Sequence, residues 1–272
     1  MSTAGAAPRN SGLDQILRGL KVQIRVTGAL ILRELHTRYG RDNIGYLWLF
    51  AEPMMLAGAV AAIHMGSKNH YGSDLRPVPF ALMGYCVFIL FRSIITRAQT
   101  TLQSNQPLLY HRTVTIFDML FSRAILEFAA TLAAYILLIG GAYALGASDL
   151  PARPLVALEA FCLMLWWSFA LSLLICAGAE VSSLVERLLH PITYLLMPIC
   201  GAFYILKWLP EPYRTWMSWF PMTQIFEMAR YGQFESLDDH YVNINYIIGW
   251  CLVLTYIGML SIKIIRRHVH PG

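Results

Sequence analysis

The chain has 272 residues, of which 57% belong to the hydrophobic set and 14% are charged, and its formal net charge at pH 7 is +5. Ordinary soluble domains carry about 25% charged residues, so the composition argues against a soluble enzyme, a disordered chain and a fibrous repeat. A bilayer-spanning helix needs about 20 apolar residues, which leaves room for about six spans in one all-α membrane domain. The sequence contains no Lys/Arg-rich run of the kind that indicates nucleic-acid binding.

The N-terminal part begins with small and polar residues and continues as an amphipathic segment. Residues 1–15 predict a mobile terminus, and residues 16–43 predict a helix that lies at the cytoplasmic membrane interface. Packing of this helix on a soluble partner is the alternative. The apolar face holds Leu17, Leu20, Ile24, Ile31 and Leu35, and the opposite basic face holds Arg18, Lys21, Arg25, Arg33 and His36.

Hydropathy predicts a transmembrane domain over residues 44–266 with six helical spans. The spans are expected at about 44–65, 79–98, 119–145, 156–179, 191–206 and 244–262. Residues 207–235 contain prolines and polar groups that disfavour a span, yet they are rich in tryptophan. This combination favours re-entrant or interfacial short helices before the last span. Polar links are expected at 100–118 and 180–190.

Basic residues are distributed unevenly across the six predicted spans. One side receives 14 Lys and Arg residues and the other receives six, while Arg92 falls within the second span. Cytoplasmic loops carry the excess of Lys and Arg in membrane proteins. Both termini are therefore predicted to face the cytoplasm. No cleavable signal pattern precedes the first span, so this span is expected to act as the membrane signal.

Sequence motifs for catalysis, nucleotide binding and metal binding are missing. The chain has no GxxxxGK(S/T), GxGxxG or HExxH pattern. Its five cysteines lie in apolar stretches without CxxC spacing and are interpreted as buried apolar residues. We therefore expect no catalytic residue, no metal and no cofactor in this chain. A membrane-embedded lipid-linked sugar transferase is an alternative, but its lone candidate acid, Glu127, is interpreted as an i,i+4 ion pair with Arg123.

The charge at Arg92 is unusual because it lies within a predicted span. A charge at the bilayer centre costs about 2.5–3.5 kcal/mol on insertion scales, so it needs a partner or a wet cavity. Glu52 lies at a similar predicted depth in the first span. An intramembrane Glu52–Arg92 ion pair is one interpretation. Contact between Arg92 and an acidic sugar or phosphate in a conduit is the other.

Three stretches of the sequence carry a family resemblance. The first comprises Arg33-Glu34, Arg38-Tyr39-Gly40 and Gly45-Tyr46-Leu47-Trp48 through Glu52-Pro53. The second comprises Asn105-Gln106 through Tyr110 and Arg112, then Asp118 and Arg123-Ala124, and the third comprises Trp219-Phe220-Pro221-Met222, Glu227 and Arg230. Over residues 25–267 the chain resembles type-2 ABC transporter permeases, and is most similar to the inner-membrane permeases of Gram-negative capsular polysaccharide (group 2 type) exporters. Phe220 departs from the family, in which Asn is common before the proline.

The resemblance implies a multi-pass transporter permease of the bacterial inner membrane that has no enzymatic activity of its own. Two copies would form a homodimer above two copies of a separate ABC ATPase subunit, which would bind ATP and magnesium. The assembly would export lipid-linked capsular polysaccharide to the periplasm. A periplasmic polysaccharide co-polymerase or adaptor and an outer-membrane exporter would continue the route. An O-antigen or teichoic-acid exporter permease is the alternative in the same class.

The resemblance also implies roles for individual residues. The substrate conduit or its entry is expected at Arg33, Arg38, Arg41, Arg92, Lys207, Trp208, Arg214, Trp216 and Trp219. Coupling to the ATPase is expected at Glu34, His36, Gln106, Leu108, Tyr110 and Arg112. Guanidinium groups suit phosphate and carboxylate, and aromatic rings can stack on the apolar faces of sugars. Simple positive-inside anchoring and an interfacial aromatic belt are the alternatives.

Overall fold

The computed structural model describes residues 12–39, 75–101 and 114–269, together with a few positions between 51 and 63. Within these ranges every regular element is helical, which confirms the predicted all-α fold class for the described part of the chain. The elements are α1 (Gly12–Tyr39), α3 (Pro77–Ala98), α6 (Ile116–Ala144), α7 (Pro154–Val181), α8 (Ser183–Ile199), the 3-10 helix η1 (Leu206–Trp208), α9 (Tyr213–Ser218), α10 (Pro221–Gln233) and α11 (Ile244–Val269).

Among the described residues, four helices are long and apolar enough to cross a membrane. They cover Pro77–Ala98, Ile116–Ala144, Pro154–Val181 and Ile244–Ile265. Their ends differ by at most three residues from the second, third, fourth and last predicted spans. The predicted first span, at 44–65, lies almost entirely outside the described residues. The described part of the chain is therefore helical and contains four candidate spans.

Helix α8, which overlaps the predicted fifth span, begins and ends earlier in the sequence than predicted. Helix α8 has 17 residues and begins directly after Ser182, whose hydroxyl accepts a hydrogen bond from the Leu184 amide at 3.3 Å. Most of the predicted polar link at 180–190 is therefore helical. The helix ends at Ile199, and Gly201 adopts a φ of +95°, which glycine accepts without steric cost. Residues 191–206 therefore do not form one continuous helix.

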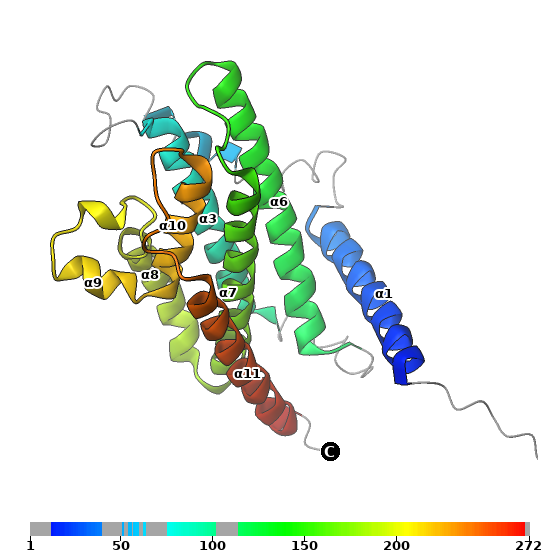
Figure 1. The fold of residues 1–272 in the computed structure, drawn as a ribbon. Coiled ribbons are helices and arrows are strands. Elements are labelled where there is room, and N and C mark those ends of the chain that lie inside the picture. The colour runs from blue at the N-terminus through cyan, green and yellow to red at the C-terminus, as the bar shows by residue number, and fades with distance from the viewer. Residues whose placement is uncertain are drawn as a thin grey trace, which may run out of the picture.

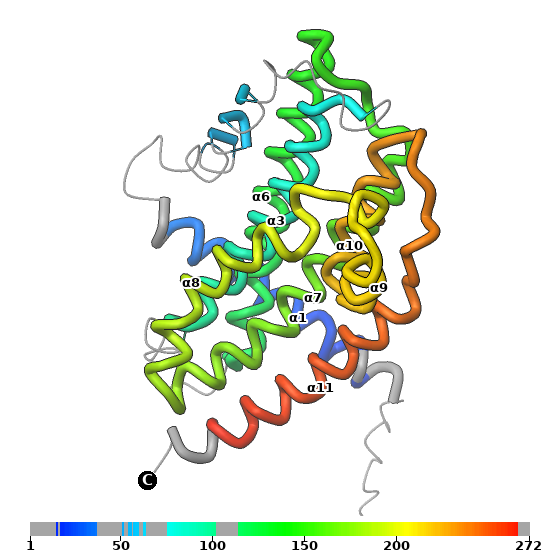
Figure 2. The backbone as a smooth tube through the Cα atoms, turned by 90° about the vertical axis from the view of Figure 1, so that its left-hand side faces the viewer, coloured from blue at the N-terminus to red at the C-terminus, as the bar shows by residue number. Residues whose placement is uncertain are grey.

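Helix α7 lies at the centre of the fold and packs against α3, α6, α10 and α11. Figures 1 and 2 show α3, α6 and α7 running side by side, with α11 along the outside of α7. A Cβ at Gly258 of α11 would lie 2.7 Å from the Cβ of Leu173. Close approach at small residues is the usual way in which helices associate within lipid. The α7–α11 contact therefore depends on glycine at this position.

Four of the five cysteines are buried, as expected. Cys162 of α7 is the exception, because its side chain is exposed. The apolar stretch around it predicts burial, but one side of α7 is left uncovered by the other described helices. A small apolar side chain on a lipid-facing surface satisfies the same sequence pattern as one in a protein core.

Residues 206–233 form η1, α9 and α10. Helix α10 packs against α3 and α7, and nearly all of its side chains are buried. Two glycines permit close approaches around this segment. A Cβ at Gly84 would lie 2.1 Å from the Ala202 carbonyl oxygen, and a Cβ at Gly232 would lie 2.6 Å from the Ala157 nitrogen. Short helices therefore occupy the Trp-rich segment, and their path through the membrane remains a prediction.

Helix α1 begins four residues before the predicted start and is amphipathic over its length. Ile31 and Leu35, in its C-terminal half, pack against Leu126 and Ala130 of α6. Its N-terminal apolar positions, 17, 20 and 24, are 52–65% exposed. The first residues of α1 and the last residues of α11 lie at the same end of the molecule (Figures 1 and 2).

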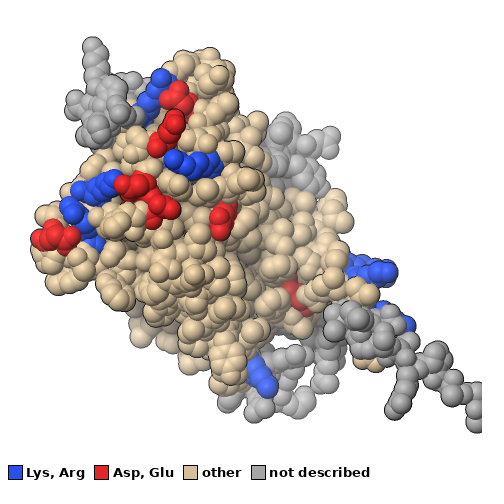
Figure 3. Space-filling view, in the orientation of Figure 1, with Lys and Arg blue, Asp and Glu red and all other residues tan. Residues whose placement is uncertain are grey.

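Charged side chains are sparse over the middle of the face that Figure 3 shows. In Figure 3 basic and acidic groups gather at the upper left of the view, and the broad central part of this face carries few charges. Exposed apolar side chains of α11, such as Leu252, Val253 and Ile257, belong to such an uncharged surface. A soluble protein rarely exposes an apolar surface of this extent, whereas a bilayer would cover it.

Candidate functional site

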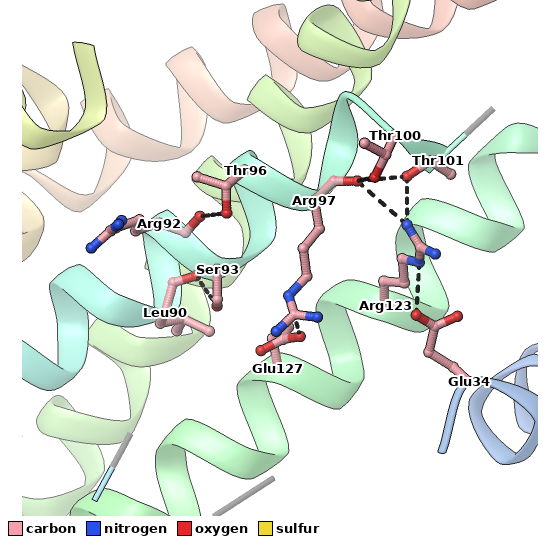
Figure 4. Close-up of polar contacts among 10 residues, drawn as sticks. All are labelled: Glu34, Leu90, Arg92, Ser93, Thr96, Arg97, Thr100, Thr101, Arg123 and Glu127. Carbon is pink, nitrogen blue, oxygen red and sulfur yellow. Dashed lines mark hydrogen bonds and ion pairs between the residues drawn. The ribbon is translucent and has the colours of Figure 1, made fainter. Parts of the chain in front are cut away.

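Ion pairs join α1, α3 and α6 where α3 ends and α6 begins (Figure 4). Oε1 of Glu34 lies 3.1 Å from Nε of Arg123. Nη1 of the same arginine donates to Oγ1 of Thr101 at 2.9 Å and to the carbonyl oxygen of Arg97 at 3.4 Å. Nε of Arg97 lies 3.1 Å from Oε1 of Glu127. We call Glu34, Arg97, Thr101, Arg123 and Glu127 the α1–α3–α6 network.

The predicted ion pair between Arg123 and Glu127 is wrong. Each of the two residues pairs instead with a residue of another helix. The side chains of Glu34, Arg123 and Glu127 are only 13%, 14% and 8% exposed. Charges at this depth require partners, so the interhelical pairs tie three helices together. The i,i+4 spacing of Arg123 and Glu127 indicates a partner on the same helix, and the sequence contains no comparable signal for partners on other helices.

The predicted polar link at 100–118 joins α3 to α6 next to the α1–α3–α6 network, and residues 102–113 of it lie outside the described residues. Thr101 directly precedes these residues, and Thr115 begins α6 with a capping box. In this box the Asp118 amide donates to Oγ1 of Thr115 at 3.2 Å, and the Thr115 amide donates to Oδ2 of Asp118 at 2.9 Å. Gln23 of α1 also donates to Asp118. Four predicted coupling residues, Gln106, Leu108, Tyr110 and Arg112, lie outside the described residues.

The five candidate residues in and after α1 have different environments. Glu34 faces α6, so its carboxylate is engaged within the chain. Arg33 is half-buried and His36 is exposed. Arg38 belongs to α1, but its side chain lies outside the described part, and all of Arg41 does as well. The sequence thus identifies the segment, while the partner of Glu34 is apparent only in three dimensions.

Arg92 lines a cavity of about 470 Å³ between α3 and α8. Its guanidinium carbon lies 3.9 Å from the centre of the Tyr194 ring, and its Nη2 donates to the Tyr194 hydroxyl. Ser93, Thr96 and Arg97 line the same cavity. A tyrosine offers a π face and an acceptor without cancelling positive charge. The cavity wall therefore combines the basic group of Arg92 and polar groups with the apolar side chains of Phe88, Ile89 and Met197.

The predicted partner of Arg92, Glu52, lies outside the described residues. Among the residues that the structure does describe, no carboxylate forms an ion pair with Arg92. Tyr194 is the partner that sequence reasoning missed. Its signal is weak, because Tyr194 is one aromatic residue in an apolar stretch more than one hundred positions away. A guanidinium in such a cavity suits phosphate or carboxylate.

Three predicted conduit residues between α8 and α10 are held by contacts within the chain. Nζ of Lys207 lies 2.6 Å from Oδ2 of Asp238, and this hydrogen bond holds the pKa of Asp238 below its usual range. Trp208 stacks on Phe80 with ring centroids 5.4 Å apart. Nε of Arg214 donates to two main-chain carbonyls of the preceding loop, at 3.0 and 3.3 Å. These contacts position the segment between α8 and α10.

Arg230 is the principal residue that the sequence-based site missed. It counts as an outer basic residue by spacing, yet its side chain is completely buried. Nη2 donates to the Ala202 carbonyl at 2.8 Å, Nη1 donates to the Tyr204 carbonyl, and the guanidinium lies 4.2 Å from the Phe80 ring centre. Glu227 lies 4.0 Å away. The Glu227–Arg230 spacing is the one sequence signal that could have indicated this pairing.

Two of the predicted sugar-contacting tryptophans are exposed. Trp216 is 63% exposed and packs edge-on against Tyr213. Trp219 is 67% exposed and packs edge-on against Tyr246 of α11, with ring centroids 6.4 Å apart. Trp219 lines a pocket of about 410 Å³ next to α10 and α11, and Trp216 is not part of the wall of this pocket. The structure thus separates two residues that look equivalent in the sequence.

The model of the ABC-2 type transporter family matches residues 25–234. The chain belongs to this family. The matched region includes most of α1, the α1–α3–α6 network, the Arg92 cavity and all of α10. The resemblance noted in the sequence is confirmed.

Relatives of this ABC-2 chain are similar over nearly its whole length. It is 33% identical over 254 residues to the capsule polysaccharide export inner-membrane protein BexB of Haemophilus influenzae, covering 93% of this chain and 96% of BexB. It is 35% identical over 252 residues to CtrC of Neisseria meningitidis serogroup B, which has the same description, covering 93% and 95%. It is 27% identical over 241 residues to the polysialic acid transport protein KpsM of Escherichia coli, covering 89% and 93%.

Proposed function

We propose that this chain is the transmembrane permease subunit of an ATP-driven exporter that moves lipid-linked capsular polysaccharide across the inner membrane to the periplasm. The observation that carries the proposal is the match between 93% of the chain and inner-membrane proteins named for capsule polysaccharide export. The candidate spans and the uncharged central surface support a membrane location.

The proposed assembly is a homodimer with two copies of an ABC ATPase subunit, which bind ATP and magnesium. Both termini lie in the cytoplasm, with the 44–65 segment as the first span and the 207–235 segment re-entering from the periplasmic side. Basic-residue counts support this orientation, as does the placement of the start of α1 and the end of α11 at one end of the molecule. A periplasmic adaptor and an outer-membrane exporter complete the route.

Coupling to ATP is assigned to the link at 100–118, centred on residues 106–112, and to α1. In this proposal Gln106, Leu108, Tyr110 and Arg112 contact the ATPase together with His36. The α1–α3–α6 network then makes three helices respond as one unit, since Arg123 holds both Glu34 and the last turn of α3. Glu34 acts through Arg123 rather than through direct contact with the ATPase.

The anionic part of the substrate is assigned to arginines. Arg33, Arg38 and Arg41 receive the charged lipid linker at the cytoplasmic surface, and Arg92 contacts phosphate or carboxylate groups within the membrane. The basic cavity at Arg92 supports this assignment. The name of the KpsM relative, a polysialic acid transport protein, supports an acidic polymer. The transferase alternative lacks support, because its candidate acid Glu127 is paired with Arg97.

ATP turnover and surface polysaccharide test this function together. Membranes holding the permease alone, the ATPase alone and both subunits are compared for ATP hydrolysis, and cells with the same combinations are stained for surface polymer. Both signals should require the pair. A permease that modifies a lipid-linked sugar without the ATPase would contradict the proposal.

The cytoplasmic link has its own test. Arg112→Glu should reduce co-purification of the ATPase, because it reverses a charge in the proposed contact segment. Arg38→Ala should lower export while membrane insertion stays normal, because it removes a guanidinium from the entry. Full ATPase binding by the first variant, or full export by the second, would overturn the corresponding assignment.

A further inference from the structure

The pocket next to Trp219 is a second candidate binding site, separate from the Arg92 cavity. The two sites share no lining residue. The walls of the pocket come from the end of α9, the first turn of α10, the segment at 240–243 and the first turn of α11. Its volume of about 410 Å³ falls in the range of known ligand sites, about 300–1,000 Å³.

One side of the pocket is aromatic and held in place. The Trp219 and Tyr246 rings meet at 86°, and the Tyr246 hydroxyl donates to the Trp219 carbonyl oxygen at 2.7 Å. Tyr246 also packs edge-on against Trp250, with centroids 6.4 Å apart. Most of the Trp219 side chain nevertheless stays exposed. An exposed indole fixed by its neighbours is pre-organised for a flat apolar ligand face.

The rest of the pocket wall is mainly polar and holds no Lys, Arg, Asp or Glu. It is formed by Ser218, Gln224, His240, Tyr241, Val242 and Asn243. The carboxamide of Gln224 orders this wall. Its Nε2 donates to the main-chain carbonyl of Ser218 at 2.6 Å, and its Oε1 accepts from the main-chain N–H of Asn243 at 3.1 Å. The side-chain oxygen of Asn243 accepts from the Tyr246 amide at 3.1 Å.

Two polar groups on this wall are available to a ligand. Within the described part of the chain, no hydrogen bond engages the side-chain nitrogen of Asn243 or the hydroxyl of Tyr241. The nitrogen is a donor, and the hydroxyl is both a donor and an acceptor. The His240 ring packs edge-on against Tyr241, with centroids 4.9 Å apart, and adds an imidazole. The wall thus offers mixed donors and acceptors, and none of its residues is Lys, Arg, Asp or Glu.

We infer that this pocket binds an uncharged sugar ring of the exported polymer, with the apolar face of the ring on Trp219 and its hydroxyls on Asn243 and Tyr241. A sugar ring combines one apolar face with a rim of hydroxyls, and the two sides of the pocket match these surfaces. The inference rests on the proposed function and adds that the chain binds the anionic groups and the uncharged sugar rings of the polymer at different sites. Anionic groups belong to the Arg92 cavity, and uncharged rings belong to the Trp219 pocket.

The test measures binding directly on the permease purified with its ATPase in lipid nanodiscs. The probes are uncharged hexaoses built from glucose, galactose, mannose or N-acetylglucosamine, and saturation-transfer NMR detects their contact with the protein. At least one probe should bind the wild type. Trp219→Ala should weaken its binding by at least about fivefold, the loss expected for one aromatic contact, and Asn243→Ala should weaken it by a smaller factor.

Tyr256→Ala is the matched control. Tyr256 is an exposed aromatic residue on the same helix as Tyr246, is 63% exposed, and lies outside the pocket wall. This variant should bind like the wild type, and Trp219→Phe should keep most of the binding because it retains an aromatic face. Retained ATP turnover and an unchanged elution volume confirm that each variant is folded.

Two results would overturn the inference. Either no uncharged probe contacts the wild type, or Trp219→Ala binds as well as the wild type does, in which case Trp219 belongs to an interfacial aromatic belt. Export of surface polymer by the wild-type pair is scored in parallel. Export without hexaose binding overturns only the pocket, and hexaose binding without ATP-dependent export overturns only the proposed function.

Discussion

The α1–α3–α6 network and the 200–238 segment use charge in different ways. In the network, each ion pair joins two separate helices, as in Glu34–Arg123 and Arg97–Glu127. In the 200–238 segment, guanidinium groups instead hold main-chain carbonyls. Arg230 binds the carbonyls before η1, and Arg214 binds those around it. The first arrangement joins separate helices to one another, and the second fixes the path of one stretch of chain.

The difference follows from the local backbone. Helices satisfy most of their own main-chain groups, so the charged side chains between α1, α3 and α6 pair mainly with one another across helices. Residues 200–212 contain no long helix and leave carbonyl groups without helical partners, which must be satisfied when buried. Arg230 supplies the donors there. The comparison therefore predicts that substitutions at Arg230 reduce folding, whereas substitutions in the α1–α3–α6 network reduce coupling to the ATPase.

The largest effect is expected at Arg230. Arg230→Met removes the donors to two buried carbonyls and leaves Glu227 in the interior without its neighbouring guanidinium. Removal of one partner from a buried charged pair costs about 3–5 kcal/mol. The yield of monodisperse protein and its unfolding temperature in detergent should both fall sharply.

Arg187→Met serves as the control for Arg230, because it makes the same chemical change at an exposed position of α8. It should leave both quantities near the wild-type values. Wild-type stability of Arg230→Met would mean that the carbonyls find other donors and would remove the contrast between the two regions.

A large effect on export is expected at Glu34, with little effect on folding. Glu34→Gln keeps the shape of the side chain but removes the charge that Arg123 faces at 3.1 Å. Arg123 retains its hydrogen bonds to Arg97 and Thr101, so α6 should stay folded. Helix α1, however, loses its ion pair with α6. Export should fall about tenfold, the equivalent of about 1.4 kcal/mol, while ATPase co-purification persists.

Glu180→Gln is the control for Glu34, since Glu180 is an exposed acid at the end of α7. Export is measured as surface polymer per unit of ATP hydrolysed, which separates coupling from expression. Equal export by Glu34→Gln and wild type would show that the ion pair is only structural. The Glu34→Gln/Arg123→Gln double variant then reports whether the two residues act together, through the non-additivity of their effects.

The effect at Arg92 distinguishes the ion-pair and conduit interpretations. Arg92→Gln should lower export severalfold without loss of membrane insertion if the cavity arginine contacts the substrate. Glu52→Gln should then keep normal assembly and export. Poor assembly of both variants would instead favour the intramembrane ion pair, since each leaves one charge unpaired in the bilayer. Tyr194→Phe, which removes only the hydroxyl that accepts from Arg92, should have a smaller effect.

The contrast between the regions also explains what the sequence could reveal. The four long apolar helices are visible because length and hydropathy alone define them. The start of α8 was misplaced because the charged turn Glu186-Arg187 looks like a loop, although Ser182 caps a helix there. The partners of Arg92 and Arg123 were missed for a different reason. They come from helices that are distant in sequence, and no local spacing signals such contacts.

The smallest effect is expected at the exposed Lys207–Asp238 pair. Asp238→Asn removes one ion pair between side chains that are 46% and 55% exposed, and exposed pairs contribute at most about 1 kcal/mol. The hydrogen bond from Lys207 lowers the pKa of Asp238 in the folded state. The ion pair therefore stabilises the folded protein fully above the ordinary carboxyl pKa, and this stabilisation is lost as the pH falls through the lowered pKa. The unfolding temperatures of wild type and Asp238→Asn should therefore differ slightly at pH 7 and converge in acid. A large difference at pH 7 would show that this surface pair, like Arg230, fixes the path of the chain.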